Sequence, residues 1–324
     1  MQNLVYRETS SDRRFGVEYE VSNNLTKKEI GKIVSQFEKS NGKEKKIKVT
    51  SGKEGWAQSI SNNFWHVKFD RTCGPLGKQF DFGWEIASYV GQGLKDSYKI
   101  SNLTKHLKEN GAEVNLNCGL HIHVEVSDFD LNNMGILYAR WLKIEDFLIS
   151  ICHPSRKNNL YCMPIRNKFE NYRYLFGSMN SLDPIELYYF LSPTNLDVHN
   201  NREKRVTLNS VNFATHQLKP HFSRNTIELR LPEFLLDENH VRNWIHLILN
   251  FVEVSKRSNF MPIDLNSCNK LSDVLLYLGL AEYKDFCILD KDLHDLKLWV
   301  LNKAKYVNKF STQAKNLLNL ATII

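Results

Sequence analysis

The chain has 324 residues, 42% of them hydrophobic and 24% charged, which is the composition of a globular protein that can bury a large core. Its 43 basic and 36 acidic residues give a formal charge of +7, a mild excess that favours anionic ligands without requiring nucleic acid. The first residues lack the apolar core of a signal peptide, and no stretch approaches the roughly 20 apolar residues that span a bilayer. We therefore expect a cytoplasmic protein that is neither secreted nor inserted in a membrane.

The first part of the chain alternates between strand and helix patterns. Residues 15–21 alternate apolar and polar side chains as a strand does, and residues 24–40 follow with apolar side chains at helical spacing. The lysine-rich run at 43–48 predicts a solvated loop. The other elements predicted here are strands at 64–70, 81–88 and 120–126 and a helix at 98–110.

The second part is richer in helix. Residues 132–152 predict a long apolar helix buried under the sheet, and 206–213 and 225–231 predict the last two strands. The chain from 267 onward is helical in pattern and suggests a small appendage that follows a linker near Pro262. The other predicted helices are 183–191, 239–258, Leu271–Leu278, 293–306 and 312–320.

The six cysteines are scattered along the chain, and no two have the spacing of a zinc knuckle or a redox motif. This usage predicts reduced thiols in a cytosolic protein. The cysteines are Cys73, Cys118, Cys152, Cys162, Cys268 and Cys287.

Glu18 and Glu20 lie two residues apart in the first predicted strand. Because strand side chains alternate with a period of two, both carboxylates project from the same face. Taken alone, such a pair is more often a solvent-facing polar edge, but two like charges on one face also favour a cation.

His121 and His123 share one face of another predicted strand in the same way. Histidine is a common metal ligand, although an isolated pair of this kind is more often a hydrogen-bonded surface pair. Glu228 and Arg230 form a third pair of this spacing, which alone could be a salt bridge within the strand. The planar fork of arginine suits phosphate, and the glutamate could hold the cation that phosphate also binds.

Asp70 and Glu85 are two further acids in apolar strand contexts, where an unpaired carboxylate is costly. Each of these single acids and pairs falls on a separate predicted strand. The presence of the whole set is much less expected by chance than the presence of any one motif. A set rich in carboxylates, with histidines and no cysteine pair, fits Mg²⁺ or Mn²⁺ better than structural zinc. The sequence lacks the glycine-rich motifs that cradle nucleotide phosphates, so metals and arginines would have to hold a nucleotide.

The ordered set of motifs resembles the amidoligase family, a branch of the glutamine synthetase and glutamate–cysteine ligase superfamily of carboxylate–amine ligases. The resemblance runs from about residue 15 to about residue 254. It implies an α+β fold in which a curved, mainly antiparallel sheet carries helices on its outer face. Together with the helical pattern of the tail, this predicts a catalytic domain at 1–258 and a helical C-terminal appendage at 267–324. The motifs that carry it are residues 15–20, 65–70, 84–88, 118–123 and 226–230.

The resemblance also implies roles for individual residues. The expected metal ligands are Glu18, Glu20, His121, Glu228, Asp70 and Glu85. Arg230 is expected to grip the transferred phosphoryl group, with Glu85 as the second catalytic group. The expected cofactor-binding residues are Arg230, His123, Arg205 and Arg202.

The implied reaction is formation of an amide or isopeptide bond from an amine and a carboxylate, with ATP and Mg²⁺ (or Mn²⁺) and through an acyl phosphate. Either substrate could be a free amino acid, a peptide or a protein. A metal-dependent hydrolase or nuclease is an alternative, because carboxylates and histidines also activate water. A non-catalytic nucleotide-binding or interaction protein is another, and assembly into a homo-oligomer is left open.

Overall fold

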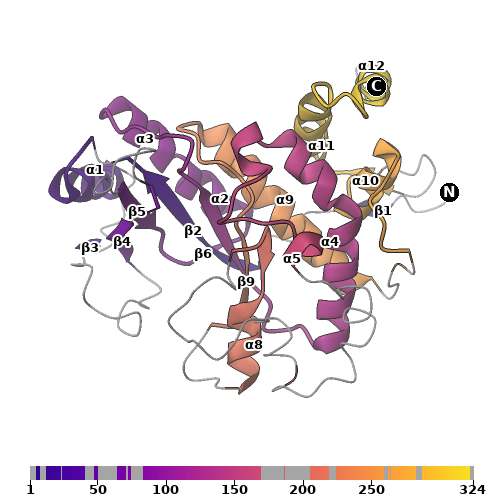
Figure 1. Cartoon of the computed structure of the whole chain (residues 1–324). Coiled ribbons are helices and arrows are strands. Elements are labelled where there is room, and N and C mark those ends of the chain that lie inside the picture. Colours follow the sequence, from indigo (N-terminus) through magenta and orange to yellow (C-terminus); the bar gives the residue numbers. More distant parts are fainter. Residues whose placement is uncertain are drawn as a thin grey trace.

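The fold is taken from a computed structural model of the whole chain (Figure 1). The residues it describes are 5–7, 12–22, 24–40, 47–49, 64–70, 72–73, 83–168, 186, 205–218, 224–258, 262, 264–281 and 287–321.

One open, mainly antiparallel sheet forms the centre of the molecule. All its pairings are antiparallel except the one between β3 and β4, and β6 (Gly91–Gln92) pairs with β2 outside the main order. The fold is therefore mixed α+β with a mainly antiparallel sheet, as predicted, and the sheet is open. The strand order is β3 (Ile47–Val49), β4 (Trp65–Asp70), β5 (Gly83–Ala87), β2 (Arg14–Val21), β7 (Leu120–Glu125), β9 (Thr226–Leu229) and β8 (Leu208–Asn209).

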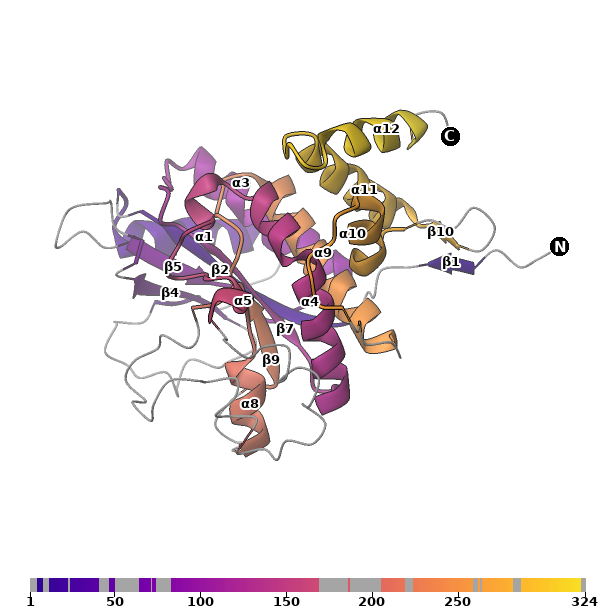
Figure 2. The ribbon, with the colours of Figure 1, turned by 45° about the vertical axis from the view of Figure 1, so that its right-hand side comes forward.

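Helices pack along one face of this sheet (Figures 1 and 2). Contacts join α1 to β4, α2 to β2 and α9 to β7, and the long helix α4 lies against α9. Among the described helices, none is both long enough and apolar enough to cross a membrane. The helices are α1 (Lys27–Ser40), α2 (Gly93–Ser101), α3 (Leu103–Glu109), α4 (Leu131–Ile151), α5 (Ile165–Lys168), α8 (Val211–Leu218), α9 (Glu238–Arg257), α10 (Leu271–Leu278), α11 (Lys291–Ala304) and α12 (Ser311–Ala321), with a short 3₁₀ helix at Pro154–Arg156.

The period-two alternation of the strands separates an apolar face from a polar one. In β2 the side chains of Val17, Tyr19 and Val21 are buried in the hydrophobic core, and Ile122 of β7 lies in the same core. The intervening residues of both strands therefore project to the opposite face, away from the packed helices. That face carries the candidate site.

The C-terminal helices extend this core. Helix α10 packs against α4 and α9, α11 packs against α9, and α12 packs against α11. A separate pair of parallel strands joins β1 (Val5–Arg7) to β10 (Cys287–Leu289), which lies between α10 and α11. Buried side chains of α10 and α11 belong to the same cluster as those of the sheet. The division into units at 1–258 and 267–324 stays a prediction.

Two predicted elements differ in the structure. Residues 206–213 do not form one strand, because β8 ends at Asn209 and α8 begins at Val211. The Asn209 side chain causes the change by accepting a hydrogen bond from the backbone N–H of Val211 at 2.8 Å, which satisfies a free donor at the helix start. The helix predicted at 98–110 starts earlier and divides at Asn102 into α2 and α3.

Other boundaries agree closely with the pattern. Gly111 has a φ of 80° just after α3, which is the left-handed conformation that glycine adopts without strain. The loop predicted at 43–48 is wrong at its end, since residues 47–49 form the edge strand β3, while residues 43–46 lie outside the described part of the chain. The helix predicted at 183–191 lies outside the described residues, except for Glu186.

Candidate active site

The strand register brings the predicted acids and histidines into adjacent rows on the polar face of the sheet. Glu20 of β2 lies opposite Glu85 of β5, and Glu18 lies opposite His121 of β7. On the next pair of strands His123 lies opposite Glu228 of β9. Side chains of residues that lie directly opposite each other on adjacent strands are neighbours. The register therefore brings together residues that are distant in sequence.

The imidazole of His121 lies at the centre of this group. Its Nδ1 is 3.3 Å from Glu18 Oε2 and 3.7 Å from Glu228 Oε1, and its Nε2 is 3.4 Å from Glu20 Oε1. The His121 side chain is buried. It therefore links three carboxylates, two from β2 and one from β9.

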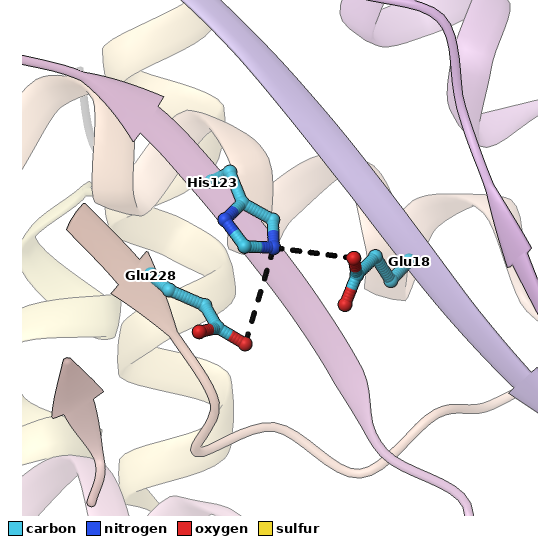
Figure 3. Close-up of side chains that lie close together, drawn as sticks. All are labelled: Glu18, His123 and Glu228. Carbon is cyan, nitrogen blue, oxygen red and sulfur yellow. Dashed lines mark ion pairs between the residues drawn. The ribbon is translucent and has the colours of Figure 1, made fainter. Parts of the chain in front are cut away.

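Glu18, His123 and Glu228 form the first group with the geometry of a metal site (Figure 3). Each offers one ligand atom, and these atoms all lie within 4.8 Å of one another. His123 Nε2 is 3.4 Å from Glu18 Oε1 and 3.9 Å from Glu228 Oε1. This nitrogen is buried, and its ion-pair partners are the carboxylates of Glu18 and Glu228, so it belongs to the charged cluster. The donor set of two carboxylates and one imidazole fits Mg²⁺ or Mn²⁺.

Arg230 forms an ion pair with Glu228. Its Nε donates to the backbone oxygen of Tyr161 at 3.3 Å, and Asn209 Nδ2 donates to the other Glu228 oxygen at 2.8 Å. Burial disfavours the charge of Arg230, but Glu228 and the other acids outweigh it and raise the pKa of the guanidinium. A permanent positive charge therefore lies at the edge of the carboxylate cluster.

Lys68 is a second cation in the site, and the sequence patterns did not single it out. Its Nζ lies 2.5 Å from Glu85 Oε1 and 3.8 Å from Glu18 Oε1. Burial disfavours its charge, yet the two carboxylates raise its pKa, so the ammonium stays protonated. The signal was present, because Lys68 precedes Asp70 by two residues in an alternating strand and must share its face.

The five acids outnumber the permanent cations that contact them. Burial alone would raise the pKa of Glu18, but Lys68, His123 and His121 hold it well below its usual value. Burial raises the pKa of Glu20. A divalent cation would relieve this excess of negative charge. The acids are Glu18, Glu20, Asp70, Glu85 and Glu228.

The remaining predicted residues are Asp70, Arg205 and Arg202. One oxygen of Asp70 accepts hydrogen bonds from the backbone N–H and the hydroxyl of Thr72, both at 2.6 Å. The guanidinium of Arg205 lies 4.6 Å from the ring centre of Tyr161, whose backbone oxygen contacts Arg230. Arg202 lies outside the described residues.

The ion pair between Glu228 and Arg230 predicts how the free energy of unfolding depends on pH in the absence of divalent ions. Burial opposes ionisation of Glu228, but Arg230, His123 and His121 lower its pKa from 4.5 to about 2. Because this pKa is lower in the folded than in the unfolded protein, ionised Glu228 stabilises the fold above pH 4.5. This contribution to the free energy of unfolding, about 3 kcal/mol in total, is lost as the pH falls toward 2. Urea unfolding should show the wild-type advantage over Glu228→Gln shrinking between pH 5 and pH 3. A constant difference across this range would contradict the ion pair.

The sheet thus carries carboxylates, imidazoles and an arginine on one face, a set of groups whose chemistry fits a divalent cation and an anionic ligand. The family model described as "Putative amidoligase enzyme" matches residues 11–252, and the chain belongs to this family. The match covers every strand of the main sheet and supports a ligase-type enzyme. A comparison with curated proteins gave no match.

Proposed function

We propose that the protein is an ATP- and Mg²⁺-dependent (or Mn²⁺-dependent) ligase that joins a carboxylate to an amine. The observation that carries the proposal is the group of Glu18, His123 and Glu228 beside Arg230, on one face of the sheet. Bound metal ions and a neighbouring guanidinium stabilise the negative charge of a phosphoryl group during its transfer. Family membership supports a ligase over other phosphoryl-transfer enzymes. We further propose that the sheet corresponds to the catalytic sheet of the glutamine synthetase and glutamate–cysteine ligase superfamily.

The residues divide into three functional groups. Glu18, His123 and Glu228 would hold one divalent ion, and His121 would orient all three neighbouring carboxylates. Bound metal would supply charge neutralisation to the phosphates. Arg230 would donate hydrogen bonds to the transferred phosphoryl group, where its fork matches two oxygens at once.

The proposed reaction has two steps. A carboxylate oxygen of the substrate attacks the γ-phosphorus of ATP, the bond to ADP breaks, and an acyl phosphate forms. The nitrogen of the amine then attacks the carbonyl carbon, and inorganic phosphate leaves with the electrons of the broken C–O bond. The amine proton passes to a carboxylate, for which Glu85 is our candidate because it lies in the same row of the sheet as Glu20.

Lys68 fits this scheme as a positioning residue. Its contacts with Glu85 and Glu18 hold the two carboxylates from β5 and β2 in fixed positions. Its side chain is 39% exposed, so it can also reach an anionic ligand on the open face. This places the positive charges of Lys68 and Arg230 on opposite strands of the site, β4 and the end of β9.

The test is mass spectrometry of the products made by the purified protein from Mg²⁺, ATP and the small-molecule fraction of a cell extract. We expect new amides, with equal amounts of ADP and phosphate, that are missing when the Glu18→Gln variant is used. The same amides formed at the same rate by that variant would contradict the proposed site. Binding of Mg²⁺–ATP without any phosphate release would instead indicate a nucleotide-binding regulator.

A further inference from the structure

Arg156 is a buried arginine that contacts the chain at the end of β9 and has no role in the reaction proposed above. It ends the short 3₁₀ helix that follows α4, and only 2% of its surface is exposed. Within the described part of the chain it forms no ion pair with a carboxylate. Burial of a charge without an ion pair is costly, so other contacts must compensate for it.

The partners of Arg156 are backbone oxygens of the segment that carries Arg230. Its Nε donates to the oxygen of Leu231 at 3.0 Å, and its Nη2 donates to the oxygen of Arg230 at 2.8 Å. Since β9 ends at Leu229, both oxygens lie beyond the last residue of the strand. A guanidinium donates hydrogen bonds in a fixed planar geometry, so one side chain here holds two consecutive peptide groups.

The segment 153–161 also restrains the chain around Arg230 at two other points. The backbone oxygen of Tyr161 accepts a hydrogen bond from Arg230 Nε at 3.3 Å. The backbone N–H of His153 donates to the Glu233 carboxylate at 3.1 Å. The segment therefore contacts both the side chain of Arg230 and the residues that follow it.

This segment starts from a rigid part of the core and reaches the edge of the candidate site. Leu148 and Ile151, near the end of α4, are buried in the hydrophobic core. At the other side of the guanidinium, a Cβ added to Gly119 would lie 3.3 Å from Arg156 Nη2 and 3.2 Å from Glu20 Oε2. A glycine at this position therefore leaves the space in which Arg156 borders the carboxylate cluster.

We propose that Arg156 is a positioning residue that holds Arg230 in the orientation needed to grip the transferred phosphoryl group. The inference rests on the proposed function, because that function gives Arg230 this role. A displacement of about 1 Å at an active site can lower the rate about 100-fold. The variant Arg156→Lys keeps the positive charge but loses the fork that reaches two backbone oxygens, so the end of β9 would lose its fixed position.

Phosphate formation by the full chain, with Mg²⁺–ATP and the small-molecule fraction of a cell extract, tests the effect on the reaction. We expect Arg156→Lys to be about 30-fold slower, with a change of about twofold or less in the KM for ATP. In an Arg230→Lys background the same substitution should cost about twofold or less, because Arg156 acts through Arg230. A wild-type rate in the folded variant, or equal losses in both backgrounds, would overturn the proposal.

The matched control is Arg140→Lys, which changes another buried arginine. Arg140 lies in α4, and its Nη2 donates to the backbone oxygen of Tyr277 in α10 at 2.6 Å. Thermal unfolding should show that both variants are destabilised, while only Arg156→Lys loses rate. An equal loss of rate in the two variants would assign Arg156 to general stability and overturn the proposal.

Nuclear magnetic resonance of the full chain labelled with ¹⁵N-arginine follows Arg230 without any turnover. Its Nε–H signal is assigned by its absence in Arg230→Lys, and the hydrogen bond to Tyr161 should protect it from exchange with water. We expect exchange to be about tenfold or more faster in Arg156→Lys and unchanged in Arg140→Lys. Unchanged protection in a folded Arg156→Lys variant would overturn the proposal, whether or not the protein makes an amide. Faster exchange in a protein that makes no amide would reject the ligase function alone.

Discussion

The Glu18→Gln variant is expected to lose divalent-metal affinity by about 100-fold or more and to lose ATP turnover with it. Removing even an indirect partner of a metal ligand commonly costs tenfold to 100-fold in affinity, and Glu18 is a proposed direct ligand. The side chain keeps its size, but its contacts with His121, His123 and Lys68 lose their charge. Electron paramagnetic resonance of free Mn²⁺ measures the affinity, and phosphate release measures turnover.

The matched control is Glu109→Gln, which removes the same charge from the exposed end of α3. It should bind Mn²⁺ like the wild type. Circular dichroism and thermal unfolding establish that both variants are folded. Equal Mn²⁺ affinity in wild type and Glu18→Gln would remove Glu18 from the metal site.

The Arg230→Lys variant is expected to form phosphate about 1000-fold more slowly, with a smaller change in the KM for ATP. Lysine keeps the positive charge but loses the planar fork, so it cannot donate two parallel hydrogen bonds to phosphoryl oxygens. It also cannot make both existing contacts, with the Glu228 carboxylate and with the backbone oxygen of Tyr161. Single-turnover measurement of phosphate formation separates the chemical step from binding.

Arg257→Lys, near the exposed end of α9, is the control for a conservative change of arginine and should keep the wild-type rate. A wild-type rate in Arg230→Lys would mean that Arg230 contributes only a point charge. A proportional rise in KM with an unchanged rate would assign Arg230 to ground-state binding of ATP.

Much of the candidate site follows from the strand period. Glu18 and Glu20, His121 and His123, and Glu228 and Arg230 each share a face because two residues separate them. The buried positions between them, such as Val17 and Tyr19 in β2, made the assignment of faces unambiguous. What the period cannot show is which strands are neighbours, so the contacts of His121 with three carboxylates appeared only in the structure.

Other features of the structure could not be predicted from the sequence, because they arise from packing between distant segments or from side-chain hydrogen bonds that compete with the strand pattern. Asn115 donates hydrogen bonds to the backbone oxygen of Cys73 and to Cys118 Sγ, and no spacing rule connects such positions. Asn209 lay inside a predicted strand, yet its side chain starts α8 and also contacts Glu228. There a side-chain hydrogen bond to the backbone prevails over the apolar alternation that predicted a strand.

In the proposed reaction the phosphoryl group of ATP passes to a carboxylate rather than to water. It is tested most directly by performing the incubation with cell-extract small molecules in H₂¹⁸O and analysing the released phosphate by mass spectrometry. A ligase that works through an acyl phosphate releases phosphate whose fourth oxygen comes from the unlabelled carboxylate substrate. We therefore predict phosphate without ¹⁸O above the background of the Glu18→Gln preparation, whereas one ¹⁸O in each phosphate would identify a hydrolase and contradict the account.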